Sequence, residues 1–316
     1  QYFNTIDVFS VGKMEVLRGG GSVQYGSDAV GGTIQVLSKE VENTEKPVWG
    51  TDLFTRFVTQ GMEQTANTAL KYSDKRTAFR ANATWRNFGD LIGGDTTGQQ
   101  SPTGYRELDF DLKGKILLAD RSNLTTVYQQ VHQRDVPVYH KVALEDYAIN
   151  KMEPQKRQLA YARLHQDFDN SIFKSVVVTA SFQHNEEGRI LQKNGSSLER
   201  TENDKVRTFG FSAETRTSTG EIWSANSGVE IYNDKVKSSR TDKDLSTNTE
   251  TVNRGLYPDG ATMTSIAAFS MHNISLQKWD ITAGARFNSF INKVTDSAFG
   301  ATKLTPSALV GNLAVQ

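Results

Sequence analysis

Residues 13–39 read KMEVLRGGGSVQYGSDAVGGTIQVLSK, two short apolar segments joined by a glycine-rich stretch. The pattern predicts a strand over Met14–Leu17, one or two helical turns over Ser22–Tyr25 and a second strand over Thr33–Leu37. The glycines stand at positions 19, 20, 21, 26, 31 and 32. They permit positive φ and close backbone approach in the two turns between these elements. A phosphate-binding loop is excluded, because neither a Gly-Lys-Ser/Thr ending nor a long helix follows them.

The composition narrows the class of protein. The chain has 316 residues, 36 basic and 36 acidic side chains and no cysteine. A net charge of zero gives no electrostatic reason to expect nucleic acid as a partner, and the lack of cysteine excludes disulfides and thiolate metal sites. No run approaches the ~18 to 20 apolar residues of a membrane helix. Many glycines and aromatic residues with only 6 prolines are typical of a chain of strands and turns.

Beyond about residue 46 the sequence alternates apolar and polar residues, which is typical of strands with two different faces. In residues 108–116, LDFDLKGKI, one face is apolar and the other carries Asp109, Asp111, Lys113 and Lys115. Roughly twelve strands are predicted. They lie at about 47–60, 64–73, 76–88, 104–118, 122–134, 156–168, 172–186, 204–217, 221–237, 260–272, 277–293 and 305–316.

The connectors between these strands alternate in length, apart from an early tight connection near Gly61-Met62. Short polar turns near residues 74, 120, 170, 219 and 273 alternate with long connectors. The long ones are expected at 89–104, 135–155, 187–203, 238–259 and 294–304. A transmembrane β-barrel has short turns on one side of the membrane and long loops on the other. We therefore predict an all-β, antiparallel barrel wall, with a large soluble all-β domain as the alternative.

In a barrel wall the charged face of each strand would line the lumen and the apolar face would meet lipid. The residues expected in the lumen are Arg80, Arg86, Asp109, Asp111, Lys113, Lys115, Glu214 and Arg286. Aromatic residues near strand ends, such as Trp49, Trp85 and Trp223, suit the girdles at the two membrane interfaces.

The glycine-rich opening resembles the carboxyl half of the plug domain of TonB-dependent outer-membrane receptors. Their plugs carry Val-Glu-Val-Leu-Arg-Gly-Pro-x-Ser-x-x-Tyr-Gly-x-x-Ala-x-Gly-Gly-x-Ile-x-Val-x-Thr-Lys. The chain departs from this pattern at Gly20, where proline is usual, and at Ser38, where threonine is usual. It agrees at Glu15, Val16, Leu17, Arg18, Gly19, Ser22, Tyr25, Gly26, Ala29, Gly31, Gly32, Ile34, Val36 and Lys39.

The resemblance implies residues 1–40 as the end of an α+β plug domain and 41–316 as the first part of a transmembrane β-barrel. Family barrels have about 22 strands around the plug. The chain begins at Gln1 and ends within the alternating run 307–315, so we expect a fragment. The missing parts would include the TonB box and the remaining strands.

The implied function is active uptake of a scarce nutrient across the bacterial outer membrane, such as a ferric siderophore, haem or cobalamin. Its partners would be the energy-coupling protein TonB, outer-membrane lipid and the nutrient. The residues expected in the plug motif and its gating are Glu15, Arg18, Gly19, Tyr25, Gly26, Gly31 and Gly32. Among these, Glu15 and Arg18 are expected to pair with lumen-facing charges of the wall, although Arg18 could instead only cap a local turn.

A second, weaker resemblance concerns the ligand. Residues 135–141, DVPVYHK, and the later Pro154-Gln-Lys-Arg157 are similar to a loop and strand of the haem and haemoprotein branch, where Val-Pro-Arg-Tyr-Asp is common. Val138 and His140 replace the Arg and Asp of that motif. Tyr139 and His140 are the candidate ligand-binding residues, with His140 as a possible axial haem ligand or simply a solvated histidine. Siderophores, cobalamin and oligosaccharides stay open.

Neither a catalytic constellation nor a metal-binding motif is present in the sequence, and no resident cofactor is expected. His132, His165, His184 and His272 are far apart, without a His-x-x-x-His pair. We therefore expect a protein that is not an enzyme. The alternative to a transporter is a non-transporting cell-surface β-protein, an adhesin or a passive porin, which would have no reason to carry the plug motif.

Overall fold

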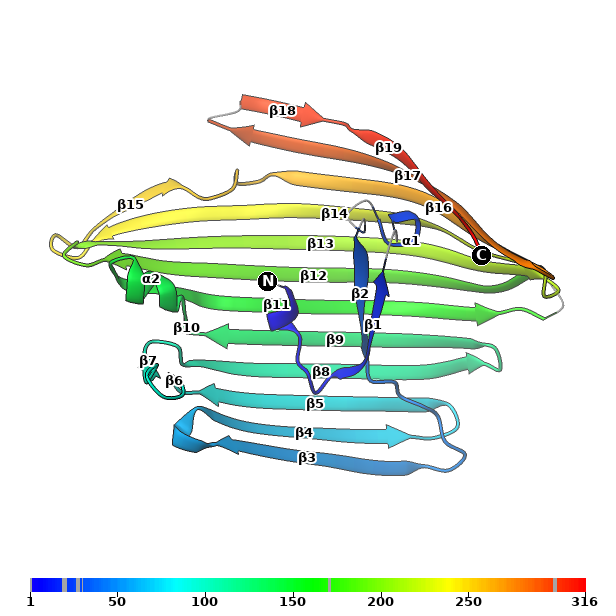
Figure 1. Cartoon of the computed structure of the whole chain (residues 1–316), viewed down its shortest axis with the longest axis horizontal. Coiled ribbons are helices and arrows are strands. Elements are labelled where there is room, and N and C mark those ends of the chain that lie inside the picture. The colour runs from blue at the N-terminus through cyan, green and yellow to red at the C-terminus, as the bar shows by residue number, and fades with distance from the viewer. Residues whose placement is uncertain (1, 19–21, 27–28, 30, 170–171, 298–299) are drawn as a thin grey trace.

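One large antiparallel sheet contains most of the chain (Figure 1). The computed structural model describes residues 2–18, 22–26, 29, 31–169, 172–297 and 300–316. Within these ranges no helix combines the length and the apolar character needed to cross a membrane. The predicted all-β fold class is confirmed.

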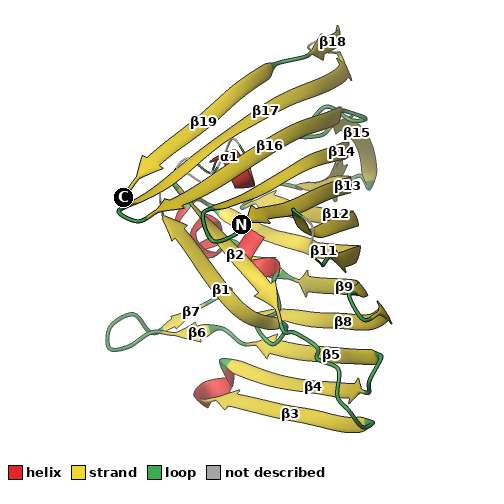
Figure 2. Ribbon diagram, turned by 90° about the vertical axis from the view of Figure 1, so that its right-hand side faces the viewer, coloured by secondary structure: helices red, strands yellow, loops and turns green. Residues whose placement is uncertain are grey.

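The chain begins with an N-terminal segment, here residues 2–40, that is separate from the large sheet. It consists of the 3-10 helix η1 (Tyr2–Thr5), strand β1 (Val11–Arg18), helix α1 (Ser22–Tyr25) and strand β2 (Gly32–Ser38). Strands β1 and β2 pair antiparallel in a sheet of their own. They lie across one face of the large sheet (Figures 1 and 2). The strand, helical turn and strand predicted from residues 13–39 are confirmed.

The large sheet, called the wall below, is 15-stranded. Its main path follows the order β3-β4-β5-β8-β9-β11-β12-β13-β14-β16-β17-β18, with β10, β15 and β19 paired at the side. Its strands are β3 (Val48–Val58), β4 (Glu63–Ser73), β5 (Thr77–Phe88), β8 (Tyr105–Ala119), β9 (Ser122–Arg134), β10 (Val136–Pro137), β11 (Tyr147–Asp167), β12 (Phe173–Lys193), β13 (Leu198–Thr219), β14 (Trp223–Asp244), β15 (Thr249–Arg254), β16 (Thr262–Leu276), β17 (Trp279–Asp296), β18 (Gly300–Leu304) and β19 (Ser307–Val315).

The connectors of the wall contain small elements. The 3-10 helix η2 (Thr59–Gly61) joins β3 to β4, the hairpin β6 (Leu91–Ile92) and β7 (Gln99–Gln100) lies between β5 and β8, and helix α2 (Tyr139–Leu144) precedes β11. The turns that join β4 to β5, β8 to β9, β11 to β12, β13 to β14 and β16 to β17 lie at one end of the wall, the short-turn end. The long connectors lie at the other, the long-loop end, together with two short ones, η2 and the turn over 194–197 between β12 and β13. The predicted alternation is confirmed in part, because the long connector predicted at 187–203 is the short turn over 194–197.

Each of the twelve predicted strands has a counterpart in the wall, but four were predicted too short. Strands β11 to β14 have 21 or 22 residues. They continue into the predicted long connectors at 135–155, 187–203 and 238–259, so those predictions were partly wrong. The reason lies in sequences such as ERTEND over 199–204, where both faces are polar. A strand with polar residues on both faces lacks the apolar–polar alternation by which a strand is predicted.

Strands β5 and β8 of the wall bury charged side chains and expose apolar ones, the reverse of a soluble protein. On the inner face, which is turned toward the N-terminal segment, Arg86 is 7% exposed and Asp109 0%. On the opposite, outer face, Phe110 is 41% exposed and Leu112 51%. Alternation along β8 separates the two sets residue by residue. The charged face and the apolar face expected from the sequence are therefore both present, while their contact with a lumen and with lipid stays a prediction.

Asp90 anchors the connector between β5 and β8. Its carboxylate accepts hydrogen bonds from the backbone N–H groups of Thr103 at 2.7 Å and Gly104 at 2.9 Å. A hydrogen bond from the Ser101 side chain, followed by these two backbone donors, lowers the pKa of Asp90 to about 2. One ionised side chain thus joins the two ends of the 89–104 connector.

We predict that this connector loosens in acid. The folded-state pKa of Asp90 lies below the ordinary 3.8, so its stabilisation is complete above about pH 4 and is lost as the pH falls toward 2. Asp90→Asn should loosen the connector at pH 4 and remove most of this pH dependence. The rate of pepsin cleavage within 89–104, followed from pH 4 to pH 2, measures it. Asp95→Asn, in the same connector, is the control and should keep the wild-type profile; a wild-type profile for Asp90→Asn would contradict the prediction.

Candidate functional site

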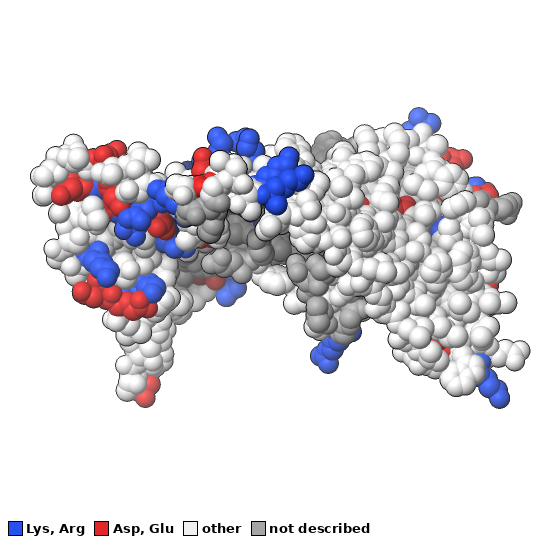
Figure 3. Space-filling model, turned by 90° about the horizontal axis from the view of Figure 1, so that it is seen from above, with Lys and Arg blue, Asp and Glu red and all other residues white. Residues whose placement is uncertain are grey.

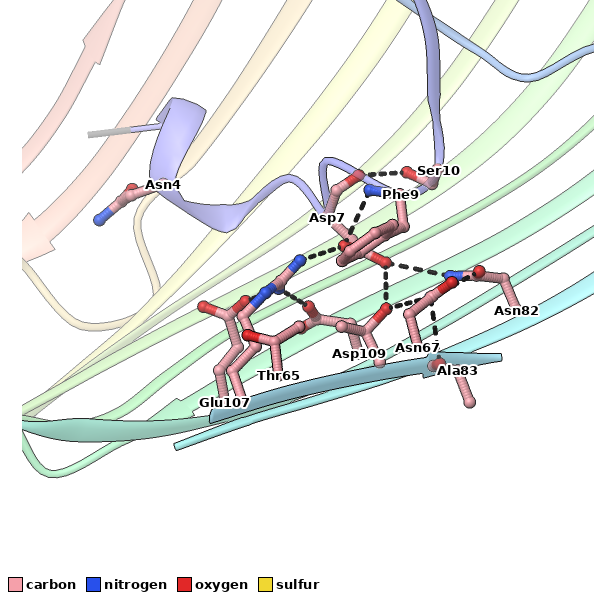
Figure 4. A network of polar contacts seen from close by, with 12 residues as sticks. Asn4, Asp7, Phe9, Ser10, Thr65, Asn67, Asn82, Ala83, Glu107 and Asp109 are labelled. Carbon is pink, nitrogen blue, oxygen red and sulfur yellow. Dashed lines mark hydrogen bonds and ion pairs between the residues drawn. The ribbon is translucent and has the colours of Figure 1, made fainter. Parts of the chain in front are cut away.

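The N-terminal segment is tied to the wall by a buried polar network around Asp7 (Figure 4). Asp7 lies in the turn between η1 and β1, where its carbonyl accepts a hydrogen bond from the Ser10 hydroxyl at 2.7 Å. Its Oδ1 also accepts the backbone N–H of Phe9 at 3.1 Å. Such local bonds, common at Asp in turns, fix the carboxylate before it meets the wall. Only 5% of Asp7 is exposed.

The wall supplies three donors to Asp7 from a single strand. Alternation along β5 places Asn82, Thr84 and Arg86 on the inner face. Asp7 Oδ2 accepts Asn82 Nδ2 at 3.0 Å and Thr84 Oγ1 at 2.8 Å. Asp7 Oδ1 accepts Arg86 Nη2 at 2.6 Å. The spacing of two residues along β5 therefore matches one carboxylate with three side chains.

Arg86 joins Asp7 to two carboxylates of the wall. Its Nη1 donates to Asp109 Oδ2 at 2.6 Å and also to Glu107 Oε1. Glu107 faces Arg86 across the β5–β8 pair. The guanidinium lies 5.4 Å from the centre of the Phe9 ring. One cation thus holds three carboxylates in a site with little water, where charge-assisted hydrogen bonds are strong.

Other contacts fix the two ends of the segment. Gln133 Nε2 donates to the Asn4 carbonyl at 2.8 Å and to Glu107 Oε2 at 2.6 Å, which extends the network to β9. Near the end of the segment, Lys113 Nζ lies 3.1 Å from Glu40 Oε1 and 3.1 Å from Ser38 Oγ. The two wall residues that make these contacts, Gln133 and Lys113, lie in or near the Asp7 network.

Helix α1 docks on a distant part of the wall. Val23 is 2% exposed, and a Cβ added at Gly284 of β17 would lie 2.9 Å from Val23 Cγ1. The close approach of helix and strand therefore requires glycine at 284. Beside it, Arg286 pairs with Glu230 at 2.5 Å and donates to Asn288 at 2.8 Å. The N-terminal segment thus contacts both β5 and β17.

The plug-motif residues predicted from the sequence lie away from the Asp7 network. Glu15 pairs at 2.5 Å with Lys13 of its own strand. Arg18 is exposed at the end of β1, and within the described ranges its side chain has no ion pair or hydrogen bond. Tyr25 is 41% exposed on α1. The pairing of Glu15 and Arg18 with wall charges stays a prediction.

The motif glycines shape the backbone of the segment. Gly26 follows α1 with φ +104°, a conformation that favours glycine. At Gly32 an added Cβ would lie 2.7 Å from the Leu17 carbonyl oxygen, so the β1–β2 pair requires glycine there. Gly31 is exposed, and Gly19 lies outside the described residues.

Tyr139 and His140 begin the short helix α2 at the long-loop end. The His140 side chain is 60% exposed and lies 3.9 Å from the Glu145 carboxylate. Their role in ligand binding stays a prediction. Sequence reasoning missed the function of Asp7. An aspartate three residues before a serine was the signal for its turn, but its three donors are about 75 residues further along the chain.

Two cavities lie between the N-terminal segment and the wall. The outer cavity, of about 440 Å³, lies between Asn4 and Thr5 and strands β11 to β14. The inner cavity, of about 300 Å³, lies between β2 and strands β8, β9 and β11. Arg157 lines both cavities. Within the described part of the chain, its guanidinium has no ion-pair partner, so it offers a positive charge to both.

Comparison with known proteins agrees with this arrangement. Residues 1–33 match the family model of the TonB-dependent receptor plug domain. A search of curated proteins found no match. The fold is similar to three solved structures. They are the copper transporter OprC (TM-score 0.78, 11% identity, 96% of this chain and 47% of that one), the FrpB iron transporter from Neisseria meningitidis, F3-3 variant (0.76, 12%, 98% and 51%), and the siderophore receptor PiuA from Acinetobacter baumannii (0.68, 15%, 97% and 52%).

The chain spans about half the length of these structures, and at this identity the likeness establishes the fold. The wall therefore has the fold of part of an antiparallel β-barrel, and the N-terminal segment, which carries the match to the plug model, lies on the inner face of the wall. The resemblance to TonB-dependent receptors inferred from the sequence is confirmed at these two levels.

We predict that Asp7→Ala frees the N-terminal segment from the wall. The variant leaves the buried donors of Asn82, Thr84 and Arg86 without their acceptor, and a buried donor left unsatisfied costs about 1–3 kcal/mol. Hydrogen exchange of residues 3–11 in the purified protein should accelerate accordingly. Glu15→Ala is the matched control, since it breaks an exposed pair worth about 0–1 kcal/mol. Equal exchange in the two variants would show that Asp7 does not hold the segment.

Proposed function

We propose that the chain is the plug end and first barrel part of a TonB-dependent receptor in the bacterial outer membrane. The observation that carries this proposal is the Asp7–Arg86 network, which seats a plug-like segment on the charged face of a wall whose other face is apolar. A plug held inside a barrel needs a polar seat, and the barrel needs a lipid-facing surface. The proposed domains are residues 1–40 for the plug and 41–316 for the barrel.

The proposed activity is active uptake of a scarce nutrient such as a ferric siderophore, haem or cobalamin, energised through TonB. The outer cavity supports a polar ligand, because Gln183, Asn185 and Asp204 line it together with Arg157. It lies beside η1, so a ligand there would touch the segment that must move for transport. The printed names of OprC, FrpB and PiuA speak of copper, iron and a siderophore, which supports a metal-containing nutrient.

Uptake of radiolabelled iron chelates by cells that express the protein tests the proposal. Accumulation should require both the protein and TonB, and it should stop when the proton gradient is collapsed. A passive porin would admit small solutes equally with and without TonB. A protein that admits no chelate under either condition while remaining at the cell surface would favour the adhesin alternative.

For haem as the nutrient, we predict that His140 contributes an axial ligand. His140→Ala should then weaken haem binding by the purified protein and shift the Soret band. His165→Ala is the matched control, because His165 lies on β11 toward the short-turn end and pairs with Asp167 at 2.9 Å. The absence of a Soret band in the wild type, or an unchanged band in His140→Ala, would remove haem binding through this residue.

A further inference from the structure

Four cations face one another on strands β13 and β14. Arg207 is directly opposite Lys235, and Lys205 is directly opposite Lys237. Their chain neighbours Thr208 and Asp234 line the outer cavity, which lies on the inner face of the wall. Because successive side chains of a strand point to opposite faces, the four cations lie on the outer face. Like charges directly opposite each other destabilise a strand pair. A bound anion would therefore stabilise two such pairs in succession.

The chain supplies too few carboxylates to balance this group, here called the basic array. Lys205 pairs with Glu186 of β12 at 2.8 Å. Arg207, Lys235 and Lys237 are exposed, and among the residues that the structure describes none of these three has an ion pair or a side-chain hydrogen bond. Three positive charges of the array are thus available to an external ligand.

The basic array adjoins an apolar surface on the same face. Two residues beyond Arg207, Phe209 is 61% exposed, and Phe211 follows at 44%. On β14, Ile231 is 43% exposed and Val229 46%. Charge gives way to hydrocarbon within two residues on β13, about 7 Å, and within four residues on β14, about 13 Å, where Asn233 lies between Lys235 and Ile231. Figure 3 shows a similar division in the view from above, where much of the surface toward the short-turn end carries no charge.

The position of the array along its strands agrees with a membrane boundary. Arg207 lies 12 residues from the short-turn end of β13 (219 − 207), and Lys235 lies 12 from that of β14 (235 − 223). A barrel strand crosses the hydrocarbon core in about 9–11 residues. The array therefore begins where the strands leave the core, on the side of the long loops, which in such barrels is the outer side.

We propose that the basic array binds the phosphate groups of a phosphorylated lipid in the outer leaflet, whose acyl chains lie on the apolar surface around Phe209. A phosphate neutralises the opposed cations, and the guanidinium of Arg207 binds it in a bidentate manner. Each cation close to a membrane surface strengthens the binding of an anionic lipid about fivefold. The proposal goes beyond nutrient uptake and rests on the membrane placement proposed above.

Native mass spectrometry of the detergent-purified protein tests this with lipid A, a diphosphorylated glycolipid, as the probe. The triple variant Arg207→Gln, Lys235→Gln, Lys237→Gln should bind it about a hundredfold more weakly than the wild type. The charge-preserving variant Arg207→Lys, Lys235→Arg, Lys237→Arg should retain most of the binding. Lys141→Gln, Lys193→Gln, Lys243→Gln removes the same total charge from the long-loop end and should bind like the wild type.

Three outcomes would contradict the assignment of the basic array, and a fourth would contradict the membrane placement on which it rests. Wild-type affinity in the Gln variant of the array would overturn the assignment of the array. Equal loss in both Gln triple variants would reduce it to a non-specific charge effect. Binding of inorganic phosphate as tightly as lipid A would identify a free-anion site. Failure to bind any lipid, including neutral phosphatidylethanolamine, would instead count against the placement in a membrane.

Discussion

The structure depends on an inverted distribution of side chains across one sheet. The wall turns Arg80, Arg86 and Asp109 inward, where they are nearly inaccessible, and exposes Phe110, Leu112 and Phe209. In water this would be costly on both sides, because charges lose their hydration and hydrocarbon keeps contact with solvent. It is stable when polar groups of the chain satisfy the inner face and an apolar medium covers the outer one. Antiparallel pairing satisfies the backbone in between.

The N-terminal segment is what satisfies the inner face near β5 and β8. Asp7 gives the buried donors of Asn82, Thr84 and Arg86 a common hydrogen-bond acceptor. Helix α1 reaches β17, far from β5 in the strand order, through the contact of Val23 with Gly284. The segment therefore links two regions of the wall that do not pair with each other, and its removal would expose buried charge at one region and an apolar contact at the other.

The sequence predicted the strands wherever the two faces differ, as in LDFDLKGKI of β8. It failed at the halves of β11 to β14 near the long-loop end, where polar residues on both faces remove the alternation. The glycine motif predicted the β1–α1–β2 segment, since glycine spacing encodes local backbone geometry. It did not predict Asp7 as the anchor, because that role depends on side chains of β5 brought near by folding. The inner-face positions of Arg86 and Asp109 were predictable from alternation alone, whereas their partners were not.

The same alternation places two chemically different surfaces back to back on β13 and β14. On the inner face, Thr208 and Asp234 are opposite each other and line the cavity between the wall and the N-terminal segment that is called the outer cavity above. On the outer face, their chain neighbours Arg207 and Lys235 are opposite each other. A shift of either strand by one residue would exchange the two surfaces. The unbroken pairing of β13 with β14 therefore sets both surfaces at once: the register that places the polar lining of the cavity on the inner face also places the opposed cations on the outer face.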